Sequence, residues 1–166
     1  MTVIAARKYN NKIVMAADSF IGSEDVNYNH QCSTPKMFDT GECVIGLTGT
    51  ADDAALLRIF SKTHKLGDRV DQSRVMDWLM EYAEWKKAKV GEWGFKSWIL
   101  LAHKSGLYIC YGISCHEVDE FASIGAGQDF ANTALYLGKS PSDAAKIACR
   151  ISNHCVEPVT EMEVLL

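Results

Sequence analysis

Short hydrophobic runs rich in β-branched residues alternate along the chain with longer stretches in which apolar residues recur every three or four positions. The first pattern is typical of strands and the second of amphipathic helices. Residues 3–6 and 12–17, with a turn near 9–11, predict an opening β-hairpin, and the polar, glycine-bearing residues 19–34 indicate a loop. The same reasoning predicts further strands at residues 36–38, 43–48, 97–102, 107–111, 121–124 and 159–166.

Helices are predicted in two pairs. Thr50 can cap the first helix, which carries acidic residues in its first turn, where the helix dipole favours anions. Ser73 can cap the second helix, whose stripe of Met and Trp residues is expected to be a packing surface rather than a cofactor site. A third helix begins near Asp129, and Ser142 begins a fourth that runs through Ile151.

The order of these elements predicts the fold class. Strands joined as hairpins imply antiparallel sheets, and helices grouped in pairs imply layers outside those sheets. A four-layer αββα sandwich, which is an α+β fold, accommodates this order, whereas periodicity alone leaves other α+β folds open. With 166 residues, no linker and no internal repeat, the chain is expected to form a single domain over residues 1–166.

Composition narrows the class of protein. Hydrophobic residues make up 48% and charged residues 23%, which indicates an ordered globular chain. The net charge of −4 argues against nucleic acid or an anionic membrane as the main partner, because there is no basic excess to neutralise phosphates. No apolar run approaches the roughly 18–20 residues of a membrane span, and Arg7 and Lys8 interrupt the N-terminal segment too early for a signal peptide. A cytoplasmic location is therefore expected.

The cysteines and glycines do not indicate a cofactor. Cys115-His116 and His154-Cys155 are the pairs that could meet around a metal ion, but sequence neighbours point in different directions, so ordinary buried thiols are expected. The Gly125-x-Gly127 segment lacks the third glycine of a dinucleotide site and the lysine of a P-loop, which favours a strand-to-helix turn. We expect neither a metal ion nor a cofactor. The six cysteines are Cys32, Cys43, Cys110, Cys115, Cys149 and Cys155.

Thr2 is the first candidate for chemistry. If methionine aminopeptidase removes Met1, Thr2 carries both a hydroxyl and a free α-amine. A hydroxyl is a poor nucleophile until a base takes its proton, and an α-amine with a pKa of roughly 7.7–8.0 can act as that base near neutral pH. One residue would then supply the nucleophile and the base, although a threonine in this position is common and means little by itself.

Three further residues are candidates to support Thr2. Asp18 follows the strand that pairs back on the N-terminal one, and Lys36 begins the next predicted strand. A lysine beside the amine would lower the pKa of that amine, and a carboxylate would orient the lysine. Gly49, at a strand end before a helix, could donate its backbone N–H to an oxyanion. A surface ion pair with a capping loop explains the same residues without any chemistry.

Several segments, taken in order, are similar to a known family. Thr2 before a hairpin, the run IVMAADS at residues 13–19, Lys36, the run GTAD at residues 49–52 and the run IGAG at residues 124–127 resemble the proteasome β-subunit family of N-terminal threonine peptidases. The resemblance is greatest to its bacterial HslV branch and covers nearly the whole chain. It implies the αββα fold of N-terminal-nucleophile hydrolases.

The resemblance also implies roles and partners. Thr2 would be the nucleophile and its amine the base, Asp18 and Lys36 would form the tuning charge pair, and Gly49 would provide the oxyanion N–H. Leu47 would line the specificity pocket, which implies a preference for apolar residues. Members of the family assemble into homo-oligomeric rings or double rings that enclose the active sites and degrade polypeptides. Rings of the HslV type work with an ATP-dependent unfoldase.

Two departures from the family keep alternatives open. Ala126 occupies the position of a serine in the glycine turn, and Ser123 lies three residues away. Family members often bind a cation through backbone carbonyls after the last helix, but residues 153–159 do not match that site, so no metal ion is predicted. The alternatives to a threonine peptidase are a hydrolase of small amides with the same nucleophile and a non-catalytic ring-forming subunit that retains Met1.

Overall fold

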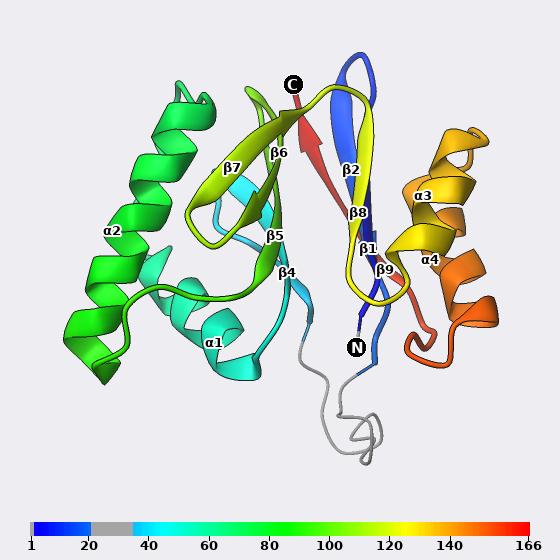
Figure 1. Ribbon diagram of the computed structural model, residues 1–166. Helices are drawn as coiled ribbons and strands as arrows, with labels where there is room; N and C mark the ends of the chain where they lie inside the picture. The colour runs from blue at the N-terminus through cyan, green and yellow to red at the C-terminus, as the bar shows by residue number, and fades with distance from the viewer. Residues whose placement is uncertain (1, 21–34) are drawn as a thin grey trace.

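A computed structural model describes residues 2–20 and 35–166 (Figure 1). Strands and helices follow one another in the predicted order of strands, a helix pair, strands, a second helix pair and a last strand. The strands are β1 (Ile4–Lys8), β2 (Lys12–Ala17), β3 (Met37–Asp39), β4 (Cys43–Thr48), β5 (Trp98–His103), β6 (Gly106–Tyr111), β7 (Ser114–Val118), β8 (Phe121–Ile124) and β9 (Thr160–Leu165). The helices are α1 (Ala51–Phe60), α2 (Gln72–Val90), α3 (Gln128–Tyr136) and α4 (Pro141–Ile151).

The strands form two antiparallel sheets. One has the order β8-β1-β2-β9 and the other the order β3-β4-β5-β6-β7. The sheets face each other, α1 and α2 cover the outer face of the five-stranded sheet, and α3 and α4 cover the outer face of the four-stranded sheet (Figure 1). The predicted four-layer αββα sandwich is confirmed.

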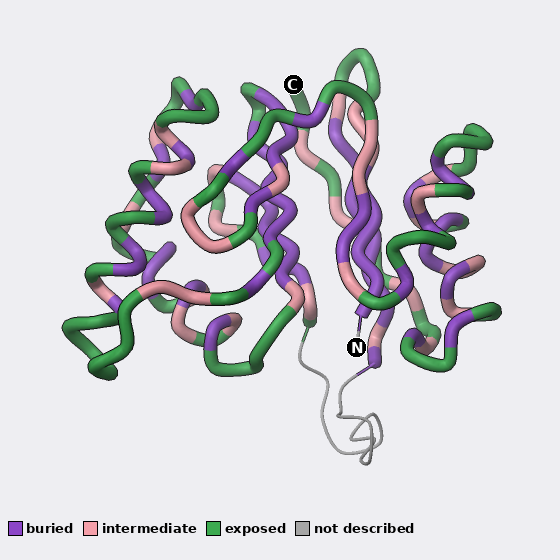
Figure 2. The backbone as a smooth tube through the Cα atoms, viewed as in Figure 1, coloured by how far each residue is buried: buried purple, intermediate pink, exposed green. Residues whose placement is uncertain are grey.

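Hydrophobic residues fill all three spaces between the layers. Figure 2 shows that the strands at the centre of the molecule are largely buried. Ile4, Met15 and Leu100 lie between the sheets. Phe60 of α1 and Trp78 of α2 lie between their helices and the five-stranded sheet. Both faces of each central strand are therefore covered, which explains why residues 13–17 are buried without interruption and why the strands do not alternate with polar residues. The layer beneath α3 and α4 consists largely of alanines, so these helices pack closely on their sheet.

Helix starts differ from the predictions in two of the four cases. Thr50 caps α1 as predicted, its hydroxyl accepting the N–H of Asp53 at 3.1 Å. The N-cap of α2 is Asp71 rather than Ser73, and the N-cap of α4 is Ser140 rather than Ser142. In α4 the proline that follows Ser140 favours the first helical position, because its missing N–H would have had no partner there. At the starts of both α2 and α4, several residues that can act as N-caps lie close together in the sequence, so composition alone did not identify the one that caps the helix.

Strand β7 was not predicted. Only Cys115 and Val118 of its five residues are buried, and the rest are exposed, so its sequence lacks the apolar run of the other strands. A tight turn after β6 places β7 antiparallel to that strand, with which it pairs from Leu107↔Val118 to Tyr111↔Ser114. Most of the predicted loop at 19–34 lies outside the described residues, as do Cys32 and Met1. Within the ranges described, no helix is long and apolar enough to span a membrane.

His103 links stability to pH. The side chain lies at the end of β5 with a relative exposure of 1%, and its Nδ1 accepts the N–H of Ser105 at 3.0 Å. Burial lowers the pKa of His103 below its ordinary value of 6.5. The folded state thus binds this proton less readily than the unfolded state, so His103 should reduce the free energy of unfolding as the pH falls below about 6.5.

We therefore expect His103→Gln, whose amide oxygen can accept the same N–H, to weaken the loss of stability between about pH 7 and pH 5. Urea unfolding at the two pH values measures this loss. His116→Gln, which removes an exposed histidine, is the matched control and should keep the wild-type pH dependence. Equal pH dependence in wild type and His103→Gln would contradict the assignment.

Candidate active site

Thr2 lies immediately before β1, and its backbone is held by the glycine turn between β8 and α3. Its relative exposure is 7%, and its carbonyl accepts the N–H of Gly127 at 3.1 Å. Gly125 has a φ of +99°, and a Cβ at this position would lie 2.3 Å from the carbonyl oxygen of Thr2. Only glycine therefore allows the turn to approach Thr2 this closely. The segment is a strand-to-helix turn, as its sequence predicted.

Asp18 follows β2 and is fully buried, with its side chain 0% exposed. Its Oδ1 accepts the N–H of Val3 at 2.8 Å and the Nζ of Lys36 at 2.6 Å. Its Oδ2 accepts the N–H of Phe20 at 3.0 Å and the N–H of Val156 at 3.2 Å. Since Val3 directly follows Thr2, this carboxylate anchors the peptide unit next to the candidate nucleophile.

Lys36 lies just before β3 with its side chain 9% exposed. Burial lowers the pKa of Lys36 below its ordinary value of 10.5, while the charge of Asp18 acts in the opposite direction. A desolvated ammonium polarises neighbouring groups more strongly than an exposed one, because water screens it less. The structure thus brings Asp18 and Lys36 into contact, and their proposed action on the amine of Thr2 stays a prediction.

Leu47 and Gly49 lie at the end of β4. The N–H of Leu47 donates to the carbonyl of Lys36 at 3.2 Å, but the Leu47 side chain is 6% exposed and belongs to the core beneath α1 and α2. Gly49 has a φ of +138° and directly precedes Thr50, the N-cap of α1. The N-terminus, the end of β4 and the start of α1 lie at the same end of the sandwich (Figure 1). The substrate-pocket role of Leu47 and the oxyanion role of Gly49 stay predictions.

Val156 and Cys155, in the segment after α4, contribute to the site. The sequence did not predict these contributions. Val156 donates its N–H to Asp18, and its carbonyl accepts both the N–H of Ser19 at 2.9 Å and the hydroxyl of Ser19 at 3.0 Å. Beside it, the Sγ of Cys155 packs so closely on Gly127 that a Cβ there would lie 2.7 Å from the sulfur. These contacts use mainly backbone groups, which any residue type provides, so the sequence carried no signal for them.

Ala126 and Ser123, the residues noted above for the serine that the family carries, lie in the glycine turn and in the strand before it. Ala126 is exposed at the tip of the glycine turn. Ser123 is buried, and its hydroxyl donates to the carbonyl of Gln128 at 2.8 Å, which closes the turn at the start of α3. The hydroxyl of Ser123 therefore supports the turn that holds Thr2.

The two Cys–His pairs lie in different halves of the molecule. Cys115-His116 belongs to β7 of the five-stranded sheet, whereas His154-Cys155 follows α4 on the other side of the sandwich. Among the residues described, no group of three or more His, Cys, Asp or Glu side chains is arranged to hold a metal ion. Burial raises the pKa of the thiols of Cys43, which is buried, and Cys149, which is half-buried, to about 12, so both stay protonated.

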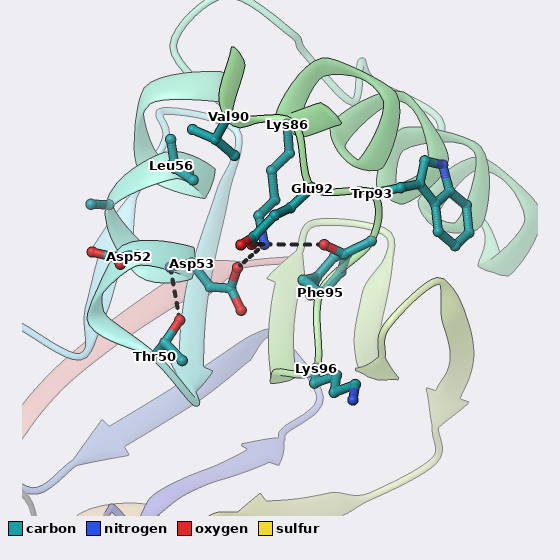
Figure 3. Close-up of a pocket in the computed structure, with 12 residues that line it drawn as sticks. Thr50, Asp52, Asp53, Leu56, Lys86, Val90, Glu92, Trp93, Phe95 and Lys96 are labelled. Carbon is teal, nitrogen blue, oxygen red and sulfur yellow. Dashed lines mark hydrogen bonds and ion pairs between the residues drawn. The ribbon is translucent and has the colours of Figure 1, made fainter. Parts of the chain in front are cut away.

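A second buried ion pair lies beside Gly49, at a cavity of about 610 Å³ between α1, the end of α2 and the segment that leads into β5 (Figure 3). The Nζ of Lys86 donates to Asp53 Oδ1 at 2.8 Å and to the carbonyl of Gly94 at 3.1 Å. The hydroxyl of Ser97 donates to Asp53 Oδ2 at 2.8 Å. The sequence identified Asp53 only as an anion in the first turn of α1, because its partners lie far along the chain.

The glycine turn yields the first test of the site. Gly125→Ala should force the turn away from Thr2, because the new Cβ would overlap the Thr2 carbonyl. Gly138→Ala is the matched control, since Gly138 also has a positive φ, +81°, but nothing lies within 4 Å of its Cβ position. Both variants should lose about 1 kcal/mol from the backbone strain. Gly125→Ala should lose stability beyond this amount and should also lose any activity that depends on Thr2, whereas Gly138→Ala should not. Similar losses of stability in the two variants would contradict the close packing of Gly125 on Thr2.

Asp18→Asn tests the buried carboxylate. The amide cannot accept all four donors, and it removes the negative charge that faces the buried ammonium of Lys36, so the free energy of unfolding should fall by about 3–5 kcal/mol. Asp68→Asn is the control, because Asp68 also binds a lysine, Lys104, at 2.6 Å but lies at the surface. That exposed pair should contribute little to stability, because water screens it. Chemical denaturation of both variants measures the difference, which should vanish if Asp18 were dispensable.

Comparison with solved structures identifies the fold. Thiobacillus denitrificans BPH in complex with epoxomicin has a TM-score of 0.86 at 15% sequence identity, with 99% of this chain and 98% of that chain covered. A second structure of Thiobacillus denitrificans BPH has a TM-score of 0.84 at 15% identity over the same shares of the two chains. Eukaryotic HslV from Trypanosoma brucei has a TM-score of 0.75 at 17% identity, with 99% of each chain covered.

Comparisons of sequence alone add nothing to this result. No protein-family model matches the chain, and no curated protein sequence matches it. The structural likeness extends over nearly the full length of both chains, so it concerns the whole sandwich rather than one motif. The resemblance drawn from the sequence is therefore confirmed at the level of the fold: this chain has the fold of the HslV-like peptidases.

Proposed function

We propose that the chain is a threonine-type peptidase subunit that uses Thr2 as its N-terminal nucleophile after removal of Met1. The observation that carries the proposal is the burial of Asp18 and Lys36 as an ion pair that also binds the peptide unit following Thr2. A buried charge pair is costly to maintain, and this one binds the N–H of Val3, the residue after Thr2, whose hydroxyl chemistry it would tune. The fold shared with HslV and BPH supports the same conclusion.

In the proposed reaction, the Thr2 hydroxyl attacks the carbonyl carbon of a peptide bond while the α-amine of Thr2 accepts its proton. The positive charge of Lys36 lowers the pKa of that amine and so keeps it available as a base near neutral pH. The N–H of Gly49 donates to the oxyanion that develops on the carbonyl oxygen. The amine then protonates the leaving nitrogen, which leaves an ester on Thr2, and a water molecule activated by the same amine hydrolyses this ester.

The proposal includes an assembly. Rings or double rings of identical subunits would enclose the Thr2 sites and admit unfolded polypeptides, with an ATP-dependent unfoldase as the partner and the cytoplasm as the location. HslV among the structural neighbours supports this arrangement. Leu47 at the end of β4 would contribute to an apolar specificity pocket.

A non-catalytic subunit of the same fold is the second candidate. Ala126 supports it, because the glycine turn beside Thr2 lacks the hydroxyl that the family carries at this position. This subunit would form rings and retain Met1, which lies outside the described residues. A hydrolase of small amides would keep Thr2 as its nucleophile and would differ from a peptidase only in its substrates.

The state of the N-terminus tests the proposed function. Intact-mass measurement of protein made in cells with active methionine aminopeptidase should show the loss of Met1. Epoxomicin, the compound bound in one structural neighbour, is the probe for a reactive Thr2. One molecule should add covalently to each chain, and peptide hydrolysis should be measurable.

Thr2→Ala should abolish both the adduct and hydrolysis, by at least about 100-fold, since nucleophile and base lie on one residue. Thr63→Ala, which removes a threonine from an exposed site, should retain both. Retention of Met1 would favour the non-catalytic subunit, and undiminished hydrolysis by Thr2→Ala would show that another group is the nucleophile.

A further inference from the structure

Lys86, Asp53 and Ser97 form a buried polar network, here called the α1 network, whose members come from three separate elements. Asp53 lies in α1, Lys86 in α2, and Ser97 directly before β5. Their relative exposures are 5%, 7% and 1%, so none of them is a surface group. The carboxylate of Asp53 uses one oxygen for Lys86 and the other for Ser97, both at 2.8 Å. Each polar group therefore has a fixed partner and a fixed orientation.

Gly49 is packed against this network. The position where a Cβ of Gly49 would lie is 2.2 Å from the Oγ of Ser97 and 2.9 Å from its Cβ. The last residue pair of the β4–β5 ladder is Thr48↔Trp98, so Gly49 and Ser97 are the next residues along the two strands. Gly49 takes a φ of +138°, which only glycine adopts readily, and it thereby admits the Ser97 hydroxyl directly against its backbone.

The network also holds the residue that follows Gly49. The N–H of Asp53 donates to the hydroxyl of Thr50 at 3.1 Å, while the Asp53 side chain holds Ser97. Gly49 is therefore confined by Thr50 along the chain and by Ser97 across the sheet, and both contacts lead to Asp53. Tyr82 of α2 further fixes this part of α1 by donating its hydroxyl to the Asp53 carbonyl at 3.3 Å.

We propose that Asp53, Lys86 and Ser97 are positioning residues that hold the backbone N–H of Gly49 in the orientation required to stabilise the oxyanion. This inference rests on the proposed function. A buried ion pair contributes little to stability compared with apolar side chains of the same volume, so packing alone does not explain its presence beside the oxyanion donor. Oxyanion stabilisation, in contrast, requires a donor whose direction is set before the reaction begins.

The test separates loss of orientation from loss of structure. Ser97→Ala removes the hydroxyl that packs on Gly49. Ser61→Ala is the matched control, because Ser61 is also a buried serine but lies at the C-terminal end of α1, where its hydroxyl donates to the Arg58 carbonyl. Each variant is assayed for hydrolysis of a peptide amide and for alkylation of Thr2 by a peptide vinyl sulfone. In the alkylation, the Thr2 oxygen adds to a carbon–carbon double bond and the adjacent carbon takes up the proton, so no alkoxide forms at a carbonyl.

Ser97→Ala should lower kcat for the amide about 10-fold with KM unchanged within about twofold, because the lost interaction acts only in the transition state. Its rate of alkylation should stay within about threefold of wild type, and Ser61→Ala should match wild type in both assays. If Ser97→Ala does not fold, Asp53→Asn, which keeps the size of the side chain, is expected to give the same separation of the two rates.

Other results would overturn the inference. Equal losses of hydrolysis and alkylation in Ser97→Ala would assign the α1 network a purely structural role, and unchanged kcat would show that Gly49 does not depend on it. A wild-type protein that neither hydrolyses the amide nor reacts with the vinyl sulfone would instead refute the proposed function, and the positioning role with it.

Discussion

Four N–H donors from separate parts of the chain converge on the buried carboxylate of Asp18. A buried carboxylate is costly unless its charge is neutralised and its oxygens accept hydrogen bonds, so Val3, Phe20, Lys36 and Val156 must all stay in place together. This requirement couples the start of β1, the end of β2, the start of β3 and the segment after α4. The position of Thr2 follows from it, because the first of these donors is the peptide N–H next to that residue.

The layered packing brings these groups to one end of the sandwich. β1 and β2 pair in register from Ile4↔Ala17 to Lys8↔Ile13, which places Asp18 directly beyond the start of β1. The alanine-rich layer under α3 and α4 lets both helices approach the four-stranded sheet closely. The glycine turn before α3 and the segment after α4 can therefore both reach Thr2 and Asp18, although they come from opposite ends of the same helix pair.

The end of β4 connects two buried ion pairs. On one side, the N–H of Leu47 binds the carbonyl of Lys36, whose ammonium binds Asp18. On the other side, Gly49 packs on Ser97, which binds the carboxylate shared with Lys86. Only Thr48 therefore lies between Leu47, which contacts the part of the site that would activate the nucleophile, and Gly49, which belongs to the part that would stabilise the oxyanion. A shift of β4 would disturb both.

Local signals were sufficient for most elements and for one cap. Hairpin turns, β-branched runs and the cap at Thr50 act within a few residues, so periodicity and composition predicted the order of strands and helices. The αββα sandwich accommodates this order, and the family resemblance selected it among α+β folds. The same signals predicted that Asp18 would lie close to Thr2, because a hairpin brings its own two ends together. They failed for β7, which has two buried residues and depends on its partner strand, and for the exact caps of α2 and α4.

The sequence by itself determined the fold class and a short set of candidate residues: Thr2, Asp18, Lys36, Gly49 and Leu47. Only the tertiary structure decided which groups complete the site, because they are backbone atoms or side chains distant in sequence. Val156 and Asp18 are 138 positions apart, and Lys86 and Asp53 are 33 apart. Such contacts form only after the sheets and helices have packed, and a backbone N–H has no signature in the residue that carries it.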